Sequence, residues 1–176
     1  MPDRGRFQYR DAEIMDLDEA ALRDGTIAPL LFGYAKVPHL PRTLQNAKLR
    51  DHGLDEGAVI AAARQLAEGM DPAIVHAIGP GHSAKRVLEA LGLEGTLLGT
   101  DLVRGGTLMA RDANERAILA AGEPLRIVVG VIGGQGYVFG RGNQELSPAV
   151  IRRAERITII ASQQKLLALE DRRLLV

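Results

Sequence analysis

The spacing of hydrophobic and polar positions along this chain alternates between the pattern of strands and the pattern of helices. Each change of pattern marks the start of a predicted element. Short apolar runs bounded by glycine, proline or charged residues are typical of buried strands. They occupy 13–17, 26–37, 73–78, 95–104, 107–111, 126–132 and 157–161. Apolar residues three or four positions apart predict helices at 54–70, 83–91, 114–121, 148–154 and 163–169. The alternation predicts an α/β fold, a layered mixed sheet with flanking helices.

The first part of the chain differs from the rest in its pattern. The strand expected at 26–37 ends before Pro38, and a loop with two prolines follows it up to Gly53. We therefore expect residues 1–53 to form a strand-and-loop segment and residues 54–176 to form the α/β core. The apolar ending at 174–176 has no polar tail, so we expect the chain to be a domain cut from a longer protein.

A glycine-rich segment directly follows the apolar run at 127–131. Five glycines fall within ten positions there, with one arginine and two amide side chains among or beside them. Glycine lets another group come close to the backbone, and arginine offers paired donors to phosphate. The segment predicts a site for a polar, phosphorylated ligand, although a glycine-rich hairpin without a ligand fits the same pattern. The candidate residues are Gly133, Gly134, Gln135, Gly136, Arg141 and Asn143.

A second glycine motif joins the strand expected at 73–78 to the next helix. The unpaired N–H groups and the dipole at a helix start attract anions. Gly79, Gly81 and Ser83 are therefore candidate phosphate contacts, although an ordinary turn with Ser83 as N-cap explains them equally well. His82, inside the turn, is the histidine that we consider as a general acid or base. The turn matches neither a P-loop nor a Rossmann fingerprint.

A third cluster lies between the hairpin strand expected at 107–111 and the following helix. Asn114 and Glu115 together donate and accept hydrogen bonds, as a grip on ribose hydroxyls requires. Helix capping by Asp112 or Asn114 is the alternative. Asp101 is a further candidate acid or base, and a carboxylate that stabilises a turn is equally compatible with its position.

Composition narrows the classes of partner. Lys and Arg total 22, as do Asp and Glu, so the formal net charge is zero and no global field attracts nucleic acid or an anionic membrane. No apolar run approaches the ~18 residues of a membrane span. There is no cysteine, and the four histidines lack metal-ligand spacing. We expect a cytoplasmic protein with no metal site of its own, and leave a homo-oligomer open.

These motifs resemble the ATP-NAD kinase-like family, the predicted polyphosphate/ATP-NAD kinases that are distant relatives of diacylglycerol kinases. The resemblance extends over nearly the whole chain. The stretches that carry it are 31–38 (LFGYAKVP), 78–81 (IGPG), 96–101 (TLLGTD), 110–115 (ARDANE), 132–136 (IGGQG) and 139–144 (FGRGNQ). The family departs from this chain at His82, where it tends to have Thr, and at Gly130-Val131, where it has Thr-Pro.

The resemblance implies transfer of a phosphoryl group from ATP or polyphosphate to the 2′-hydroxyl of NAD, with Mg²⁺. It implies that Asn114 and Glu115 help to hold NAD, and that the glycine-rich segment with Arg141 lines a site between two domains. Family members also carry an N-terminal nucleotide-binding domain with a Gly-Gly-Asp-Gly-Thr motif, which this sequence does not contain. We therefore expect a C-terminal, ligand-binding domain that is inactive alone.

Two other functions use the same residues. In sugar-phosphate isomerase and deaminase folds, two such loops clamp one phosphate and a carboxylate moves a proton; Asp101 or Glu115 would be that base. A non-catalytic nucleotide-sensing or oligomerisation domain is the third possibility. In each case we expect the turn at 79–83 and the segment at 133–142 to lie close together, because both follow the ends of predicted strands.

Overall fold

The computed structural model describes residues 8–18, 20–21, 29–39, 52–131, 136–140, 142–167, 169 and 173–174. The chain divides into two compact units, Met1–Arg50 and Asp51–Val176. No helix in the described ranges combines the length and the apolar character needed to cross a bilayer.

The first unit contains a two-stranded antiparallel ribbon, made of β1 (Gln8–Leu17) and β2 (Pro29–His39). β1 begins earlier than the sequence pattern predicted. β2 passes through Pro38, which pairs with Tyr9, so the expected end of the strand before Pro38 was wrong. A ribbon of two strands has two outer edges, where the missing N–H of a proline breaks no ladder.

The second unit is built on a five-stranded mixed sheet with the order β5-β4-β3-β6-β7, and this confirms the predicted fold class. Its central strand β3 is parallel to β6 and antiparallel to β4. β6 and β7 are parallel, whereas β4 and β5 form an antiparallel hairpin. The strands are β3 (Val75–Ile78), β4 (Asp101–Arg104), β5 (Thr107–Ala110), β6 (Leu125–Gly130) and β7 (Ala154–Ile160).

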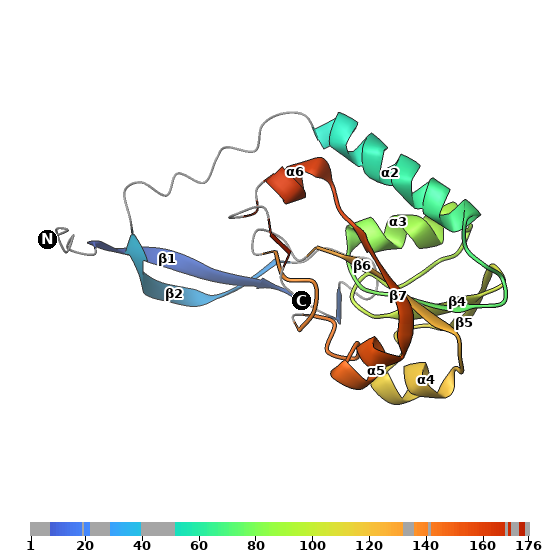
Figure 1. Ribbon diagram of the computed structural model, residues 1–176. Helices are drawn as coiled ribbons and strands as arrows, with labels where there is room; N and C mark the ends of the chain where they lie inside the picture. The colour runs from blue at the N-terminus through green and yellow to red at the C-terminus, as the bar shows by residue number, and fades with distance from the viewer. Residues whose placement is uncertain are drawn as a thin grey trace, which may run out of the picture. The chain divides into compact units, whose positions relative to one another are not determined.

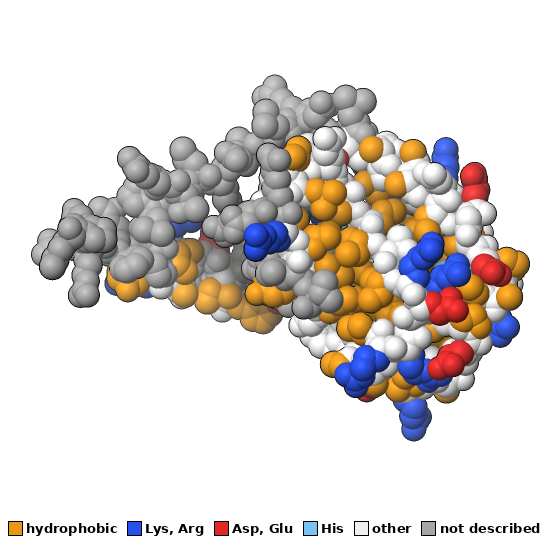
Figure 2. All heavy atoms as spheres, in the orientation of Figure 1, with side chains coloured by type: hydrophobic (Ala, Val, Ile, Leu, Met, Phe, Trp, Pro, Cys, Tyr) orange, Lys and Arg blue, Asp and Glu red, His pale blue; other side chains and the backbone are white. Residues whose placement is uncertain are grey.

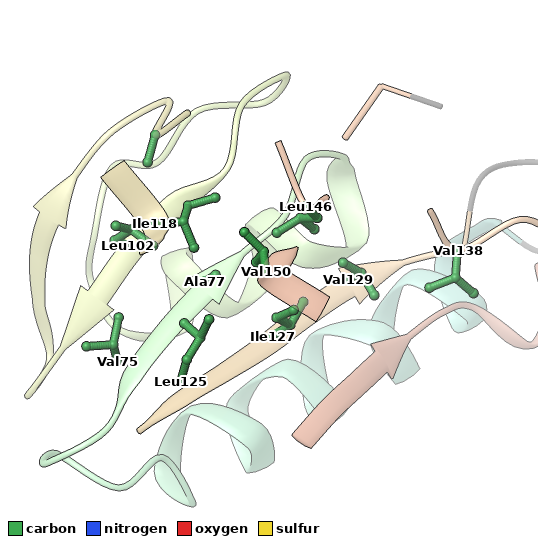
Figure 3. Close-up of a cluster of buried hydrophobic side chains, with 11 residues drawn as sticks. Val75, Ala77, Leu102, Ile118, Leu125, Ile127, Val129, Val138, Leu146 and Val150 are labelled. Carbon is green, nitrogen blue, oxygen red and sulfur yellow. The ribbon is translucent and has the colours of Figure 1, made fainter. Parts of the chain in front are cut away.

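Helices cover both faces of this sheet, with α2 and α3 on one side and α4 and α5 on the other (Figure 1). One core joins side chains of β3, β4 and β6 to Ile118 of α4 and Val150 of α5 (Figure 3). The second core joins Ile78 and Val128 to the packed faces of α2 and α3. The helices are α2 (His52–Glu68), α3 (His82–Ala90), α4 (Glu115–Ala120), α5 (Pro148–Arg153) and α6 (Gln163–Leu167).

Burial on both faces explains why β6 appears in the sequence as one continuous apolar run. Ile127 and Val129 face the first core, whereas Val128 between them faces the second. Strands that are covered by helices on both sides carry apolar residues at every position rather than at alternate ones. In the view of Figure 2, apolar side chains also gather over β7, where Ile159 is 37% exposed.

The strand expected at 95–104 begins only at Asp101. The preceding residues form a tight loop that leaves no room for side chains at its two glycines. A Cβ on Gly95 would overlap Leu88, and a Cβ on Gly99 would overlap Asp112. The apolar residues in this stretch therefore belong to a packed loop, which hydrophobic patterning alone does not distinguish from a strand.

Candidate functional site

The adjacent parallel strands β3 and β6 end at the same edge of the sheet, where Ile78 pairs with Val128. From β3 the chain continues through α3 to β4 on one side, and from β6 it continues through α5 to β7 on the other. The two connections leave on opposite faces of the sheet (Figure 1). This edge is therefore a topological switch point, the place where ligands gather in open α/β sheets.

The turn after β3 requires glycine at two positions, because of a close contact at Gly79 and of the backbone conformation at Gly81. The Gly79 N–H donates to the Val128 carbonyl at 2.8 Å, and a Cβ on Gly79 would lie 3.0 Å from Val129 Cγ1. The Gly81 N–H donates to the Leu97 carbonyl at 2.8 Å, and Gly81 has φ of 102°. Residues with a side chain rarely adopt that backbone conformation, so glycine is needed at this point.

Gly81, rather than Ser83, is the N-cap of α3, and no side chain caps the helix start. The alternative in which Ser83 is an N-cap is therefore wrong. Ser83 is instead the second residue of the helix and is 8% exposed. His82 is exposed at the first helical position, and its acid–base role stays a prediction. The first N–H groups of α3 are thus left without a side-chain acceptor.

The turn after β3 lies against residues on both sides of the glycine-rich segment. A Cβ on Gly130, at the end of β6, would be 3.9 Å from Ser83 Cβ. A Cβ on Gly79 would be 3.5 Å from Leu146 Cδ1. Gly133, Gly134, Gln135 and Arg141 themselves lie outside the described residues.

Asn143 organises the described end of the glycine-rich segment. Its Oδ1 accepts from the Gly140 N–H and its Nδ2 donates to the Val138 carbonyl, each at 2.9 Å. Asn143 is 3% exposed, and Val138 packs in the first core. Gly136 has φ of 74°, and a Cβ there would lie 2.9 Å from the Arg173 carbonyl. These contacts fix the turn, so Asn143 has a structural task besides its predicted ligand contact.

Asp101 is fully buried at the start of β4 and accepts three hydrogen bonds. The donors are the Thr96 N–H at 2.6 Å, the Thr96 hydroxyl at 3.0 Å and the Asp112 N–H at 3.0 Å. The carboxylate therefore holds the loop before β4 against the turn after β5. This is the turn-stabilising role that the sequence left open, and its catalytic role stays a prediction.

Asn114 and Glu115 stand at the start of α4, where both side chains have partners in the fold. Asn114 is the N-cap, and its Oδ1 accepts from the Ala117 N–H at 3.0 Å. The Glu115 carboxylate accepts from the Ser147 hydroxyl at 2.5 Å, and Ser147 is itself the N-cap of α5. The pair thus links the starts of two helices, and both residues remain exposed.

Two contacts near this edge are not apparent from the sequence. The buried Thr100 hydroxyl donates to the Glu145 carboxylate at 2.5 Å. The ammonium group of Lys165, from α6, lies 3.4 Å from the carbonyl of Val131, just after β6. Lys165 brings a cation to the switch point, but it is separated from Val131 by too many residues for local patterning to reveal the contact.

No group of three or more histidine, aspartate or glutamate side chains in the described ranges is arranged to hold a metal ion. The described residues therefore do not fit a Mg²⁺ ion bound by the protein alone, and we derive no step through one. Their chemistry combines backbone and hydroxyl donors and the Lys165 cation with carboxylates that already accept hydrogen bonds within the fold.

Comparison with known proteins identifies a family. Residues 73–176 match the family model described as the ATP-NAD kinase C-terminal domain. This range is more than half of the chain, and it includes all five strands of the sheet and all three glycine- or carboxylate-bearing motifs of the candidate site. No curated protein and no solved structure matches the chain.

Proposed function

We propose that this chain, which belongs to the ATP-NAD kinase family through its C-terminal domain, binds NAD or another phosphorylated small molecule at the carboxyl edge of β3 and β6. The observation that carries the proposal is the uncapped start of α3, which lies beside the end of β6 at the switch point. Free N–H groups at a helix start are suited to phosphate oxygens.

Different residues of this edge contact different parts of the ligand. The α3 backbone and the Ser83 hydroxyl donate to phosphate, and the Lys165 ammonium supplies a positive charge nearby. Asn114 and Glu115 contact ribose hydroxyls, and Arg141 adds a guanidinium group from the glycine-rich segment. Phosphoryl transfer depends mostly on positioning and charge neutralisation, so a domain of this kind would orient the acceptor. ATP or polyphosphate, with Mg²⁺, would serve the full-length family members.

Calorimetric titration tests this site with three ligands: NAD, ribose 5-phosphate and glucosamine 6-phosphate. We expect saturable NAD binding by the wild-type chain. Binding of a sugar phosphate without NAD would favour the isomerase or deaminase function and contradict the proposal. Absence of binding by all three would leave the non-catalytic domain as the better explanation.

Variants at the proposed edge locate the binding. Hydrogen bonds to charged groups contribute roughly 1.5–3 kcal/mol, so Ser83→Ala, Lys165→Met and Arg141→Ala should each weaken NAD binding about tenfold or more. Matched controls are Thr107→Ala and Arg104→Met, which remove a hydroxyl and a cation from the β4–β5 hairpin at the opposite edge. Equal losses in the controls and the site variants would show that NAD binds elsewhere.

A further inference from the structure

The opposite end of β3 carries a pocket that the proposed function does not use. Its volume is about 180 Å³, and it lies between the end of α2, the end of α3 and the β4–β5 hairpin. Its apolar walls come from Ala67, Met70, Leu91 and Val103. The hairpin turn closes one side with Gly105 and Gly106, and His76 of β3 contributes an imidazole. Asp71 and Pro72 complete the lining.

His76 presents a hydrogen-bond acceptor to this pocket. Its Nδ1 lies 3.1 Å from the Ile74 carbonyl, so Nδ1 carries the proton and donates there. The other ring nitrogen, Nε2, is then an acceptor, and no described residue bonds to it. His76 is only 4% exposed. No fully buried polar side-chain atom in the described ranges lacks a partner, so Nε2 keeps some exposure, and we infer that it is exposed at the pocket that His76 lines.

Neutral imidazole is the form that this environment favours. Burial lowers the pKa of His76, and the positive charge of Arg126 lowers it further, while the hydrogen bond to Ile74 and the charge of Asp71 raise it. The neutral ring neither repels nor attracts a ligand by charge, and the charged group of the lining, the Asp71 carboxylate, is exposed and accepts from the Ala73 N–H at 2.9 Å. The ring selects instead for a group that donates one hydrogen bond.

Size and chemistry together define the ligand class. An apolar cavity of about 150 Å³ is large enough to hold benzene, and this pocket is slightly larger. We propose that the pocket binds a compact aromatic molecule that carries one hydrogen-bond donor, with His76 Nε2 as the acceptor. The apolar walls hold the ring, and the imidazole selects the hydroxyl or N–H group on it.

Phenol and toluene are suitable probes because they have nearly the same size and differ in the donor. We expect phenol to bind the full chain with a Kd on the order of 1 mM, measured by two-dimensional NMR titration, with shifts at Val103 and at the Gly105 and Gly106 amides. Saturable shifts elsewhere but not at these residues, or no saturable shifts at all, would overturn the proposal.

Two variants separate filling of the pocket from loss of the acceptor. Ala67→Leu fills the pocket and should abolish phenol binding, whereas Ala61→Leu places the same side chain at an exposed position of the same helix and should leave binding unchanged. His76→Leu should lower the preference for phenol over toluene roughly threefold to tenfold, the range of a neutral hydrogen bond. Equal weakening of both probes would make His76 a structural residue and contradict the proposal, and so would unchanged phenol binding in Ala67→Leu.

Discussion

Asp101 is a charged side chain that is completely removed from solvent, and its oxygens are occupied by three donors from two loops. Asparagine has almost the same shape but turns an amide toward donors that need an acceptor. We therefore expect Asp101→Asn to lower the free energy of unfolding by roughly 1.5–3 kcal/mol, measured by urea denaturation.

Asp112 provides the matched control for that variant. It is exposed and has φ of 47°, a backbone conformation that asparagine adopts readily. Asp112→Asn should therefore change the stability little. If both variants unfold at the same urea concentration, the buried hydrogen bonds of Asp101 do not stabilise the loop as described.

His76 makes stability depend on pH. Burial holds the pKa of the folded state below the ordinary value of about 6.5, so the unfolded chain takes up this proton first. The contribution of neutral His76 to the free energy of unfolding is therefore fully present above pH ~6.5. It is lost as the pH falls from there through the lowered pKa. Urea denaturation at pH 7.5 and 5.5 should show a larger decrease for the wild type than for His76→Leu, because the other histidines contribute equally to both. Identical decreases would contradict this account.

At the scale of elements, α2 contains a replaceable glycine. Gly57 lies inside this helix, and a Cβ there would meet no atom within 4 Å. Gly57→Ala should raise the free energy of unfolding by about 0.5–1 kcal/mol, because alanine loses less backbone entropy in a helix. Thermal unfolding measures the change.

Gly81, the N-cap of the next helix α3, is the contrasting position. Its side is also open, but its φ of 102° excludes an unstrained alanine. Gly81→Ala should therefore destabilise the protein. A gain of stability at Gly81, or a loss at Gly57, would show that the two backbone conformations differ from those described.

Some of these elements could be predicted from the sequence, and others could not. The starts of α4 and α5 could be predicted because their caps, Asn114 and Ser147, act on residues three positions away. The loop at 95–100 could not be predicted, because its apolar residues resemble a strand. Its two glycines are required by close contacts with Leu88 and Asp112, which the local sequence does not reveal. The Thr100–Glu145 and Lys165–Val131 contacts likewise join segments whose proximity is created by the sheet order.

At the scale of the molecule, the two hydrophobic cores belong to the second unit, and the family match lies within it as well. The candidate edge offers donors and a cation, while the Gly-Gly-Asp-Gly-Thr motif that the resemblance implies for an N-terminal nucleotide-binding domain does not occur in this sequence. We expect the purified 176-residue chain to form no NADP from NAD with ATP or polyphosphate, measured by an NADP-specific dehydrogenase assay. NADP formation above that of a heat-denatured control would contradict this expectation.

The order of strands in the sheet also has a consequence for biosynthesis. Val75 of β3 pairs with Leu125 of β6, so about fifty residues must leave the ribosome before the central pair of strands can form. The β4–β5 hairpin and the neighbouring helices can assemble during that interval, while the apolar edge of β3 remains unpaired. Such distant pairings slow folding and leave hydrophobic surface open to other chains. The pairing of β3 with β6 therefore makes the synthesis of β6 the step on which formation of the sheet depends.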